Sequence, residues 1–112
     1  CLMPFALNEA TRYINPTKTL EYMAAGKPIV STAVPDVLHH FTPIVEVADT
    51  HGAFVDAVQR AWSAPRTDMI ARGIDRARNA TWEATVTSMR KLMLDAVFGR
   101  APATRTRTAA AA

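Results

Sequence analysis

The chain has 112 residues, enough for one small domain, and its hydrophobic share of 49% is ordinary for a folded protein. Its net charge of +3 comes from Arg100, Arg105 and Arg107, so the rest of the chain is neutral and we expect no nucleic-acid partner. A single cysteine cannot form an internal disulfide, and the sequence shows no metal-ligand spacing. It also has no apolar run long enough to span a membrane. These features favour a cytoplasmic protein.

The first predicted element is an apolar strand at Cys1–Phe5, which leads through a loop into a helix at Pro16–Ala25. Asn15 can accept hydrogen bonds from the free amides of the first turn, and proline suits the first helical position. Gly26 suits the left-handed position that commonly follows the end of a helix. These signals mark both ends of the helix.

Strand-like and helix-like segments alternate along the rest of the chain. This alternation predicts an α/β fold in which short parallel strands are joined by crossover helices and followed by C-terminal helices. We place one domain at residues 1–98 and predict a disordered tail, rich in Ala, Thr and Arg, at residues 99–112. The tryptophans and methionines are expected to pack in the core. The further elements are strands at Pro28–Thr32 and Pro43–Val47, helices at Pro35–Phe41 and Thr67–Asn79, a helix capped by Thr50 that runs to Ala64, and one capped by Thr81 that runs to Phe98.

Two charged residues, Lys18 and Glu21, lie three positions apart on the predicted helix and therefore share one of its faces. Lys18 lies in the first turn, where unpaired amides and the helix dipole attract an anion such as a diphosphate. Glu21 lies one turn deeper, where its carboxylate can accept a hydrogen bond from a hydroxyl group. The alternative is an ordinary surface ion pair, which stabilises a helix by about 0.2–0.5 kcal/mol.

The stretch from Asn15 to Thr32 resembles the donor-binding, C-terminal half of glycosyltransferases with two Rossmann-like domains, known as the GT-B fold. It is most similar to the retaining enzymes of group 1, in which a Pro-x-Lys-x-x-Glu-x-x-Ala-x-Gly-x-Pro-Val-Val pattern lies on the helix facing the nucleotide-sugar. The resemblance covers Cys1 to Phe41 well and the later helices loosely, and it implies a partial Rossmann-like half of that fold. The residues that fill the pattern are Pro16, Lys18, Glu21, Ala24, Gly26, Pro28, Ile29 and Val30.

The resemblance also implies roles for individual residues. Glu21 matches the acid that binds the ribose hydroxyls of the donor nucleotide, while Thr17 and Lys18, with Asn15 before them, lie where the helix start meets the diphosphate. Lys18 is the candidate catalytic residue, because its charge would stabilise the departing diphosphate. The family commonly has a second acid eight residues before the conserved glutamate. Tyr13 takes this position and is included among the substrate-binding residues.

The implied activity is the transfer of a sugar from a nucleotide-sugar donor to an acceptor, without a metal or another cofactor. The loop Ala6–Ile14 would contact the donor sugar. Because the chain begins at Cys1 inside an apolar run, we interpret it as a fragment that lacks the N-terminal, acceptor-binding domain and is inactive alone. The complete enzyme would be cytoplasmic and could associate with a membrane surface. The alternative is a non-catalytic Rossmann-like binding or interaction module. Tyr13, in place of the usual acid, would then indicate that the donor chemistry is lost.

Overall fold

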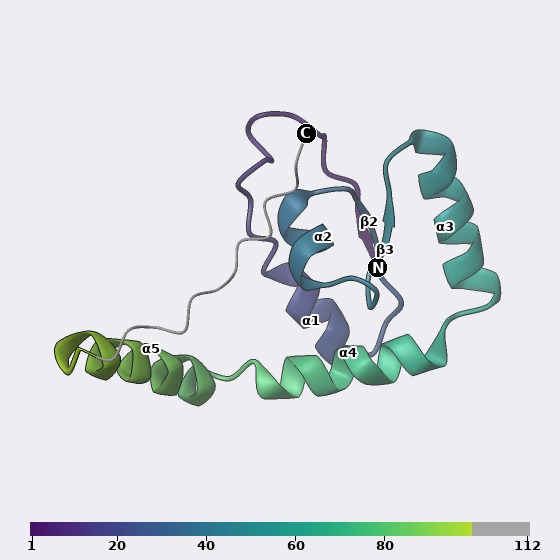
Figure 1. Ribbon diagram of the computed structural model, residues 1–112. Helices are drawn as coiled ribbons and strands as arrows, with labels where there is room; N and C mark the ends of the chain where they lie inside the picture. The colour runs from purple at the N-terminus through teal and green to yellow at the C-terminus, as the bar shows by residue number, and fades with distance from the viewer. Residues whose placement is uncertain (100–112) are drawn as a thin grey trace. The chain divides into compact units, whose positions relative to one another are not determined.

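The computed structural model describes residues 1–99 and divides into two compact units, Cys1–Ala80 and the segment that begins at Thr81. The first unit contains a three-stranded sheet and helices α1 to α4, and the second contains helix α5 (Figure 1). The tail predicted at residues 99–112 lies outside the described residues, except for Gly99. No helix within residues 1–99 is both long and apolar enough to cross a membrane.

The sheet consists of strands β1 (Leu2–Met3), β2 (Val30–Thr32) and β3 (Glu46–Ala48), which are parallel and lie side by side in chain order. The predicted α/β fold with short parallel strands is therefore confirmed. β3 begins three residues later than predicted. The reason is a turn at the expected strand start, in which the amide of Val45 donates to the carbonyl of Phe41 (2.9 Å).

Local sequence signals explain where several helices begin. Thr50 caps α3 by accepting a hydrogen bond from the amide of Ala53 (3.2 Å), as predicted. Thr81 caps α5 by accepting one from the amide of Ala84 (3.1 Å). Proline occupies the first turn of α2, which follows β2 after only two residues. The helices are α1 (Lys18–Ala24), α2 (Pro35–His40), α3 (His51–Ser63), α4 (Thr67–Asn79) and α5 (Trp82–Val97), all within two residues of the predicted bounds.

Helices α1 and α2 cover one face of the sheet, and α3 covers the other (Figure 1). The core beneath α1 and α2 depends on one fully buried side chain from each helix, Met23 and Val37. On the opposite face, Ala57 of α3 is buried. The main core consists of Met3, Met23, Ile29, Val34, Val37, Phe41 and Val45.

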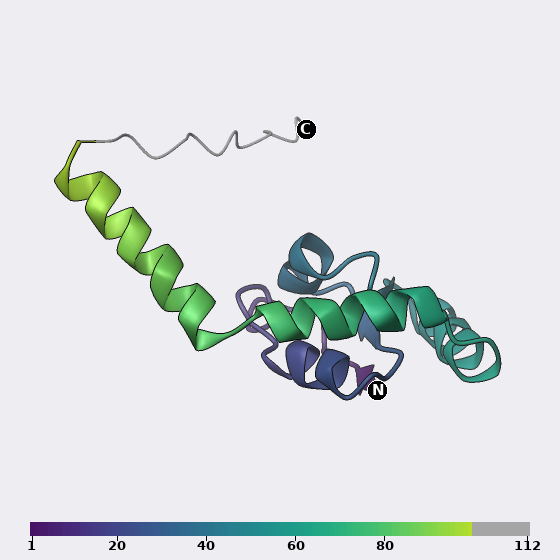
Figure 2. The same ribbon diagram turned by 90° about the horizontal axis from the view of Figure 1, so that it is seen from below.

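The C-terminal end of α1 is fixed by a glycine in the left-handed conformation. Gly26 has a φ of 63°. Its amide donates to the carbonyl of Met23 (3.0 Å), and the amide of Lys27 donates to that of Tyr22 (3.3 Å). These two bonds form a Schellman motif, so the role predicted for Gly26 is confirmed. Helix α4 runs alongside α1 (Figure 1 and Figure 2), and a Cβ added to Gly26 would lie 3.3 Å from Cδ1 of Ile74.

The expectation that both tryptophans pack in the core is wrong within the described residues. Trp62 on α3 is 88% exposed, and Trp82 on α5 is 81% exposed. Met3 and Met23 are buried as expected, whereas the methionines of α5 are exposed. Helical spacing identifies the side chains that share a face, but burial requires a second element against that face. Residues 81–99 contain one helix and supply no such element of their own.

Candidate functional site

The carboxyl ends of the three parallel strands meet at one edge of the sheet, which is where ligands bind in open α/β folds. Residues 4–17 connect β1 to α1, and residues 33–34 connect β2 to α2. The loop before α1 thus leaves the sheet at the carboxyl edge. All of the predicted site residues, on this loop and on α1, are exposed: Tyr13, Asn15, Thr17, Lys18 and Glu21.

Helix α1 begins at Lys18 rather than Pro16, and the predicted cap by Asn15 is wrong. Thr17 occupies the cap position with helical backbone angles, and no side chain caps the helix. The amide of Thr17 donates to the carbonyl of Asn15 (3.0 Å). The amide of Thr19 likewise donates to the carbonyl of Pro16 (3.0 Å). This tight turn uses amides that were expected to be free, so an anion here would be held mainly by the Lys18 side chain.

Lys18 and Glu21 share one exposed side of α1. Among residues 1–99 no ion pair joins them, so the surface pair considered as an alternative is not formed in this part of the chain. Thr19, which lies between them in sequence, is fully buried, and its hydroxyl donates to the sulfur of Met3 (3.5 Å). Thr19 therefore lies on the side of α1 that packs against the sheet, whereas Lys18 and Glu21 are exposed to solvent.

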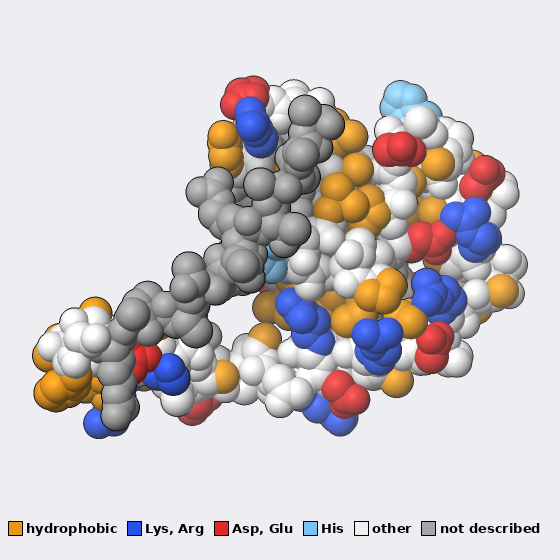
Figure 3. Space-filling view, in the orientation of Figure 1, with side chains coloured by type: hydrophobic (Ala, Val, Ile, Leu, Met, Phe, Trp, Pro, Cys, Tyr) orange, Lys and Arg blue, Asp and Glu red, His pale blue; other side chains and the backbone are white. Residues whose placement is uncertain are grey.

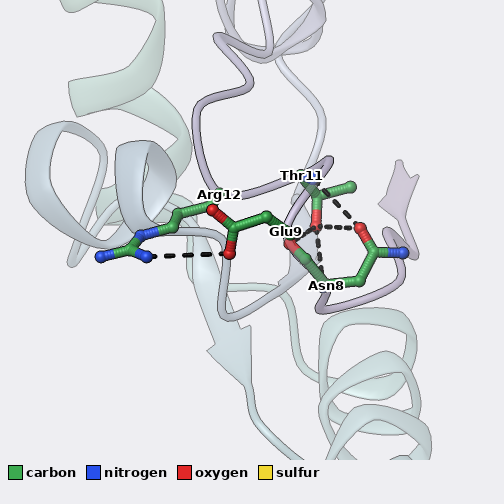
Figure 4. A network of polar contacts seen from close by, with 4 residues as sticks. All are labelled: Asn8, Glu9, Thr11 and Arg12. Atoms are coloured by element: carbon green, nitrogen blue, oxygen red, sulfur yellow. Dashed lines mark hydrogen bonds and ion pairs between the residues drawn. The ribbon is translucent and has the colours of Figure 1, made fainter.

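The loop that precedes α1 is organised by its own side chains (Figure 4). The amide of Asn8 donates to the hydroxyl of Thr11 (3.1 Å), and the amide of Thr11 donates to the side-chain oxygen of Asn8 (3.2 Å). The hydroxyl of Thr11 also donates to the carbonyl of Ala6. Glu9, the one carboxylate of residues 6–14, is exposed and pairs with Arg12 at 3.7 Å. The loop that the resemblance assigns to the donor sugar therefore has a defined shape of its own.

A further hydrogen bond ties this loop to the sheet. The hydroxyl of Thr32, the last residue of β2, donates to the carbonyl of Phe5 (2.9 Å). The neighbouring Ser31 is fully buried, and its hydroxyl lies 2.9 Å from the carbonyl oxygen of Thr32 and 3.4 Å from that of Met3. Side chains at the end of β2 thus hold the backbone that leaves β1, and they set the place where the loop begins.

We expect Thr32→Val to lower the free energy of unfolding by about 1 kcal/mol, because it removes one hydrogen bond while keeping the shape of the side chain. The loop should also become more mobile, which ¹⁵N relaxation would report as lower order parameters at Asn8 and Thr11. The matched control is Thr42→Val, which removes a bond from the Thr42 hydroxyl to the carbonyl of Leu38 (2.7 Å). If both variants leave the loop equally rigid, the Thr32 bond does not hold it.

Tyr13 lines an open hollow that the sequence did not predict, with a volume of about 380 Å³. Across it lies the start of α2, where the carboxylate of Asp36 is 3.5 Å from Nε2 of His40. The guanidinium carbon of Arg12 lies 5.5 Å from the centroid of the Tyr13 ring. The other predicted site residues do not line this hollow. The only sequence signal for it is that Asp36 closely follows a strand, which places it at the carboxyl edge.

Within residues 1–99, no three His, Cys, Asp or Glu side chains lie close enough together to hold one metal ion. No protein-family model, curated protein or solved structure matches the chain. The function proposed below therefore depends on the motif and on the geometry of the carboxyl edge.

Proposed function

We propose that the chain is the donor-binding half of a retaining GT-B glycosyltransferase of group 1, which transfers a sugar from a nucleotide-sugar to an acceptor. The observation that supports this most is the position of Lys18 and Glu21. Both lie on the exposed side of α1, the helix that follows the loop at the carboxyl edge of a parallel sheet, and they are not paired with each other within residues 1–99. A cation and a carboxylate so placed suit a ligand with one anionic and one hydroxyl-bearing end.

In this proposal Lys18 binds the diphosphate of the donor. When the bond between the sugar and the diphosphate breaks, negative charge builds on the leaving oxygen, and a fixed ammonium group nearby lowers the energy of that state. Because amides near the start of α1 are bonded to backbone carbonyls, the positive charge comes from the side chain rather than from the helix end. The hydroxyl of Thr17 and the side-chain amide of Asn15 add neutral hydrogen-bonding groups near the Lys18 ammonium.

Glu21 accepts hydrogen bonds from the ribose hydroxyls in the same proposal, one turn away from the diphosphate. A carboxylate is well suited to this task because each of its oxygens can accept a bond from a hydroxyl. The donor sugar then lies toward the loop at residues 6–14, where Tyr13 replaces the usual acid. The acceptor site, and with it turnover, belongs to a second domain in this proposal.

A second candidate function is a non-catalytic binding module that keeps the fold without the transfer chemistry. Two observations favour it. Tyr13 stands where the family commonly has an acid, and the amides of Thr17 and Thr19 are bonded to backbone carbonyls rather than free for a phosphate.

Binding experiments distinguish the two candidates. We expect the chain to bind a nucleoside diphosphate and its sugar conjugate, tested with a panel of UDP, GDP, ADP, UDP-glucose and GDP-mannose by ¹⁵N-resolved NMR titration. Lys18→Ala and Glu21→Ala should each weaken the binding of these nucleotides about tenfold or more. Each variant removes a charge-assisted hydrogen bond of about 1.5–3 kcal/mol. Lys18→Ala should weaken the binding of a nucleoside diphosphate and of its sugar conjugate by a similar factor. In an enzyme that joins this chain to an acceptor domain, Glu21→Ala should mainly raise the donor KM, and Lys18→Ala should also lower kcat.

The controls for this experiment are Lys91→Ala and Glu83→Ala, which remove the same charges from α5. They should leave the affinity of every ligand in the panel unchanged. Equal affinities in all four variants, or no binding to any member of the panel, would rule out the donor site and favour the binding module.

A further inference from the structure

A second cavity lies at the opposite, amino edge of the sheet, inside the unit that spans Cys1–Ala80. It is enclosed by the C-terminal ends of α1 and α3, the start of α4, and the residues that enter β2 and β3. Its volume is about 330 Å³, within the range of pockets that hold small organic ligands. None of the residues assigned to the donor lines it, so the two sites are separate.

The floor of this cavity is apolar. Ile29 and Met23 are buried beneath it, and Ile44, Met69 and Ile70 form partly buried walls. The approach of α4 to α1 is close here, because a Cβ on Gly73 would lie 3.3 Å from Cγ of Met23. An apolar group that entered the cavity would therefore leave water and contact side chains on several sides.

The rim, in contrast, carries three cations and one carboxylate. Arg60 pairs with Glu46, through Nε to Oε1 at 2.9 Å and a second contact from Nη2. Within residues 1–99, neither Lys27 nor Arg66 takes part in an ion pair. Two positive charges at the rim are thus left without a carboxylate partner in the described residues. Figure 3 shows Lys and Arg side chains gathered around an apolar area between α3 and α4.

We propose that this cavity binds a small organic anion with an apolar body, of the class of aromatic or short acyl carboxylates. The volume admits a body of two fused rings or a short acyl chain, and the apolar floor favours its burial. The carboxylate stays at the rim, where the Arg66 guanidinium can donate two parallel hydrogen bonds and Lys27 adds a second charge. Because the head group remains near solvent, the anion keeps part of its hydration.

This site does not depend on the donor site proposed above. The two lie at opposite edges of the sheet, and they take different ligands: a diphosphate ester with hydroxyl groups at one, a carboxylate with an apolar body at the other. Failure of the nucleotide titration therefore leaves this proposal intact, and failure of the test below leaves the donor site intact.

The test uses 2-naphthoate as the probe and 2-naphthamide as its uncharged counterpart, each titrated into the full chain by ¹⁵N-resolved NMR. We expect 2-naphthoate to shift the resonances of residues that line the cavity, and 2-naphthamide to bind about tenfold more weakly, because it lacks the charge that the rim recognises. Equal affinity for the two probes would overturn the proposal. So would shifts confined to the exposed apolar side chains of α5.

Two charge reversals, one at the residue that precedes α4 and one near the C-terminal end of α4, make the test site-specific. Arg66→Glu should weaken 2-naphthoate binding about tenfold or more and leave 2-naphthamide binding unchanged. An acid at this position suits the start of a helix, so the variant should remain folded. Arg78→Glu makes the same change about 18 Å further along the helix and should leave both affinities unchanged. If Arg66→Glu binds 2-naphthoate as tightly as the unaltered chain, the rim does not recognise anions.

Discussion

Replacing Met23 with alanine is expected to lower the free energy of unfolding by about 2–5 kcal/mol, the range for removing a long side chain from a packed core. Met23 is only 1% exposed. It projects from α1 into the main core, and it lies directly beneath Gly73 of α4. Because Gly73 has no side chain, it cannot fill the cavity left behind. Urea denaturation followed by far-UV circular dichroism would measure the loss.

The matched control is Met93→Ala on α5, where the methionine is 67% exposed. This substitution removes the same atoms without opening a cavity, so the free energy of unfolding should change by less than about 0.5 kcal/mol. Similar losses in the two variants would mean that the apolar side of α5 is covered in solution. A small loss in both would mean that the core around Met23 is loosely packed.

Gly26→Val is expected to destabilise the chain by about 2–3 kcal/mol, for two reasons that act together. The φ of 63° is unfavourable for a branched side chain, and the new Cβ would lie 3.3 Å from Cδ1 of Ile74. Relief of either strain would break the Schellman motif or push α4 away from α1. The midpoint of urea unfolding should fall accordingly.

Gly52→Val provides the comparison for this substitution. Gly52 lies in the first turn of α3, and a Cβ there would meet no atom within 4 Å. The free energy of unfolding of the Gly52→Val variant should be unchanged or slightly higher, because valine has a better helix propensity than glycine. If the two valine variants unfold at the same urea concentration, the left-handed position of Gly26 is not important for folding.

Features determined by nearby residues could be predicted from the sequence. The caps at Thr50 and Thr81 and the stop at Gly26 each depend on atoms within a few residues, and all three are as predicted. The starts of α1 and β3 were wrong by two and three residues. In both places a tight backbone turn, at Asn15–Thr19 and at Phe41–Val45, uses groups that local propensity would assign to the regular element.

The candidate sites were predictable to a similar extent. Helical spacing was enough to place Lys18 and Glu21 on a common side of α1, since that depends only on helix geometry. The hollow beside Tyr13 and the cavity at the amino edge bring together segments that are distant in sequence, so no spacing could reveal them. The exposure of Trp62 has the same origin, because periodicity does not tell which faces have a neighbour.

The connections on either side of β2 differ in a way that limits how the chain can change in length. Between β1 and α1, residues 4–17 form a surface loop that could gain or lose a residue at its tip with little effect on the sheet. Between β2 and α2 there are only two residues, and one of them, Val34, is fully buried. An insertion there would shift the start of α2 relative to β2 and disturb the burial of Val34 and Val37. Variation in length among related sequences should therefore be found in the first connection and be absent from the second.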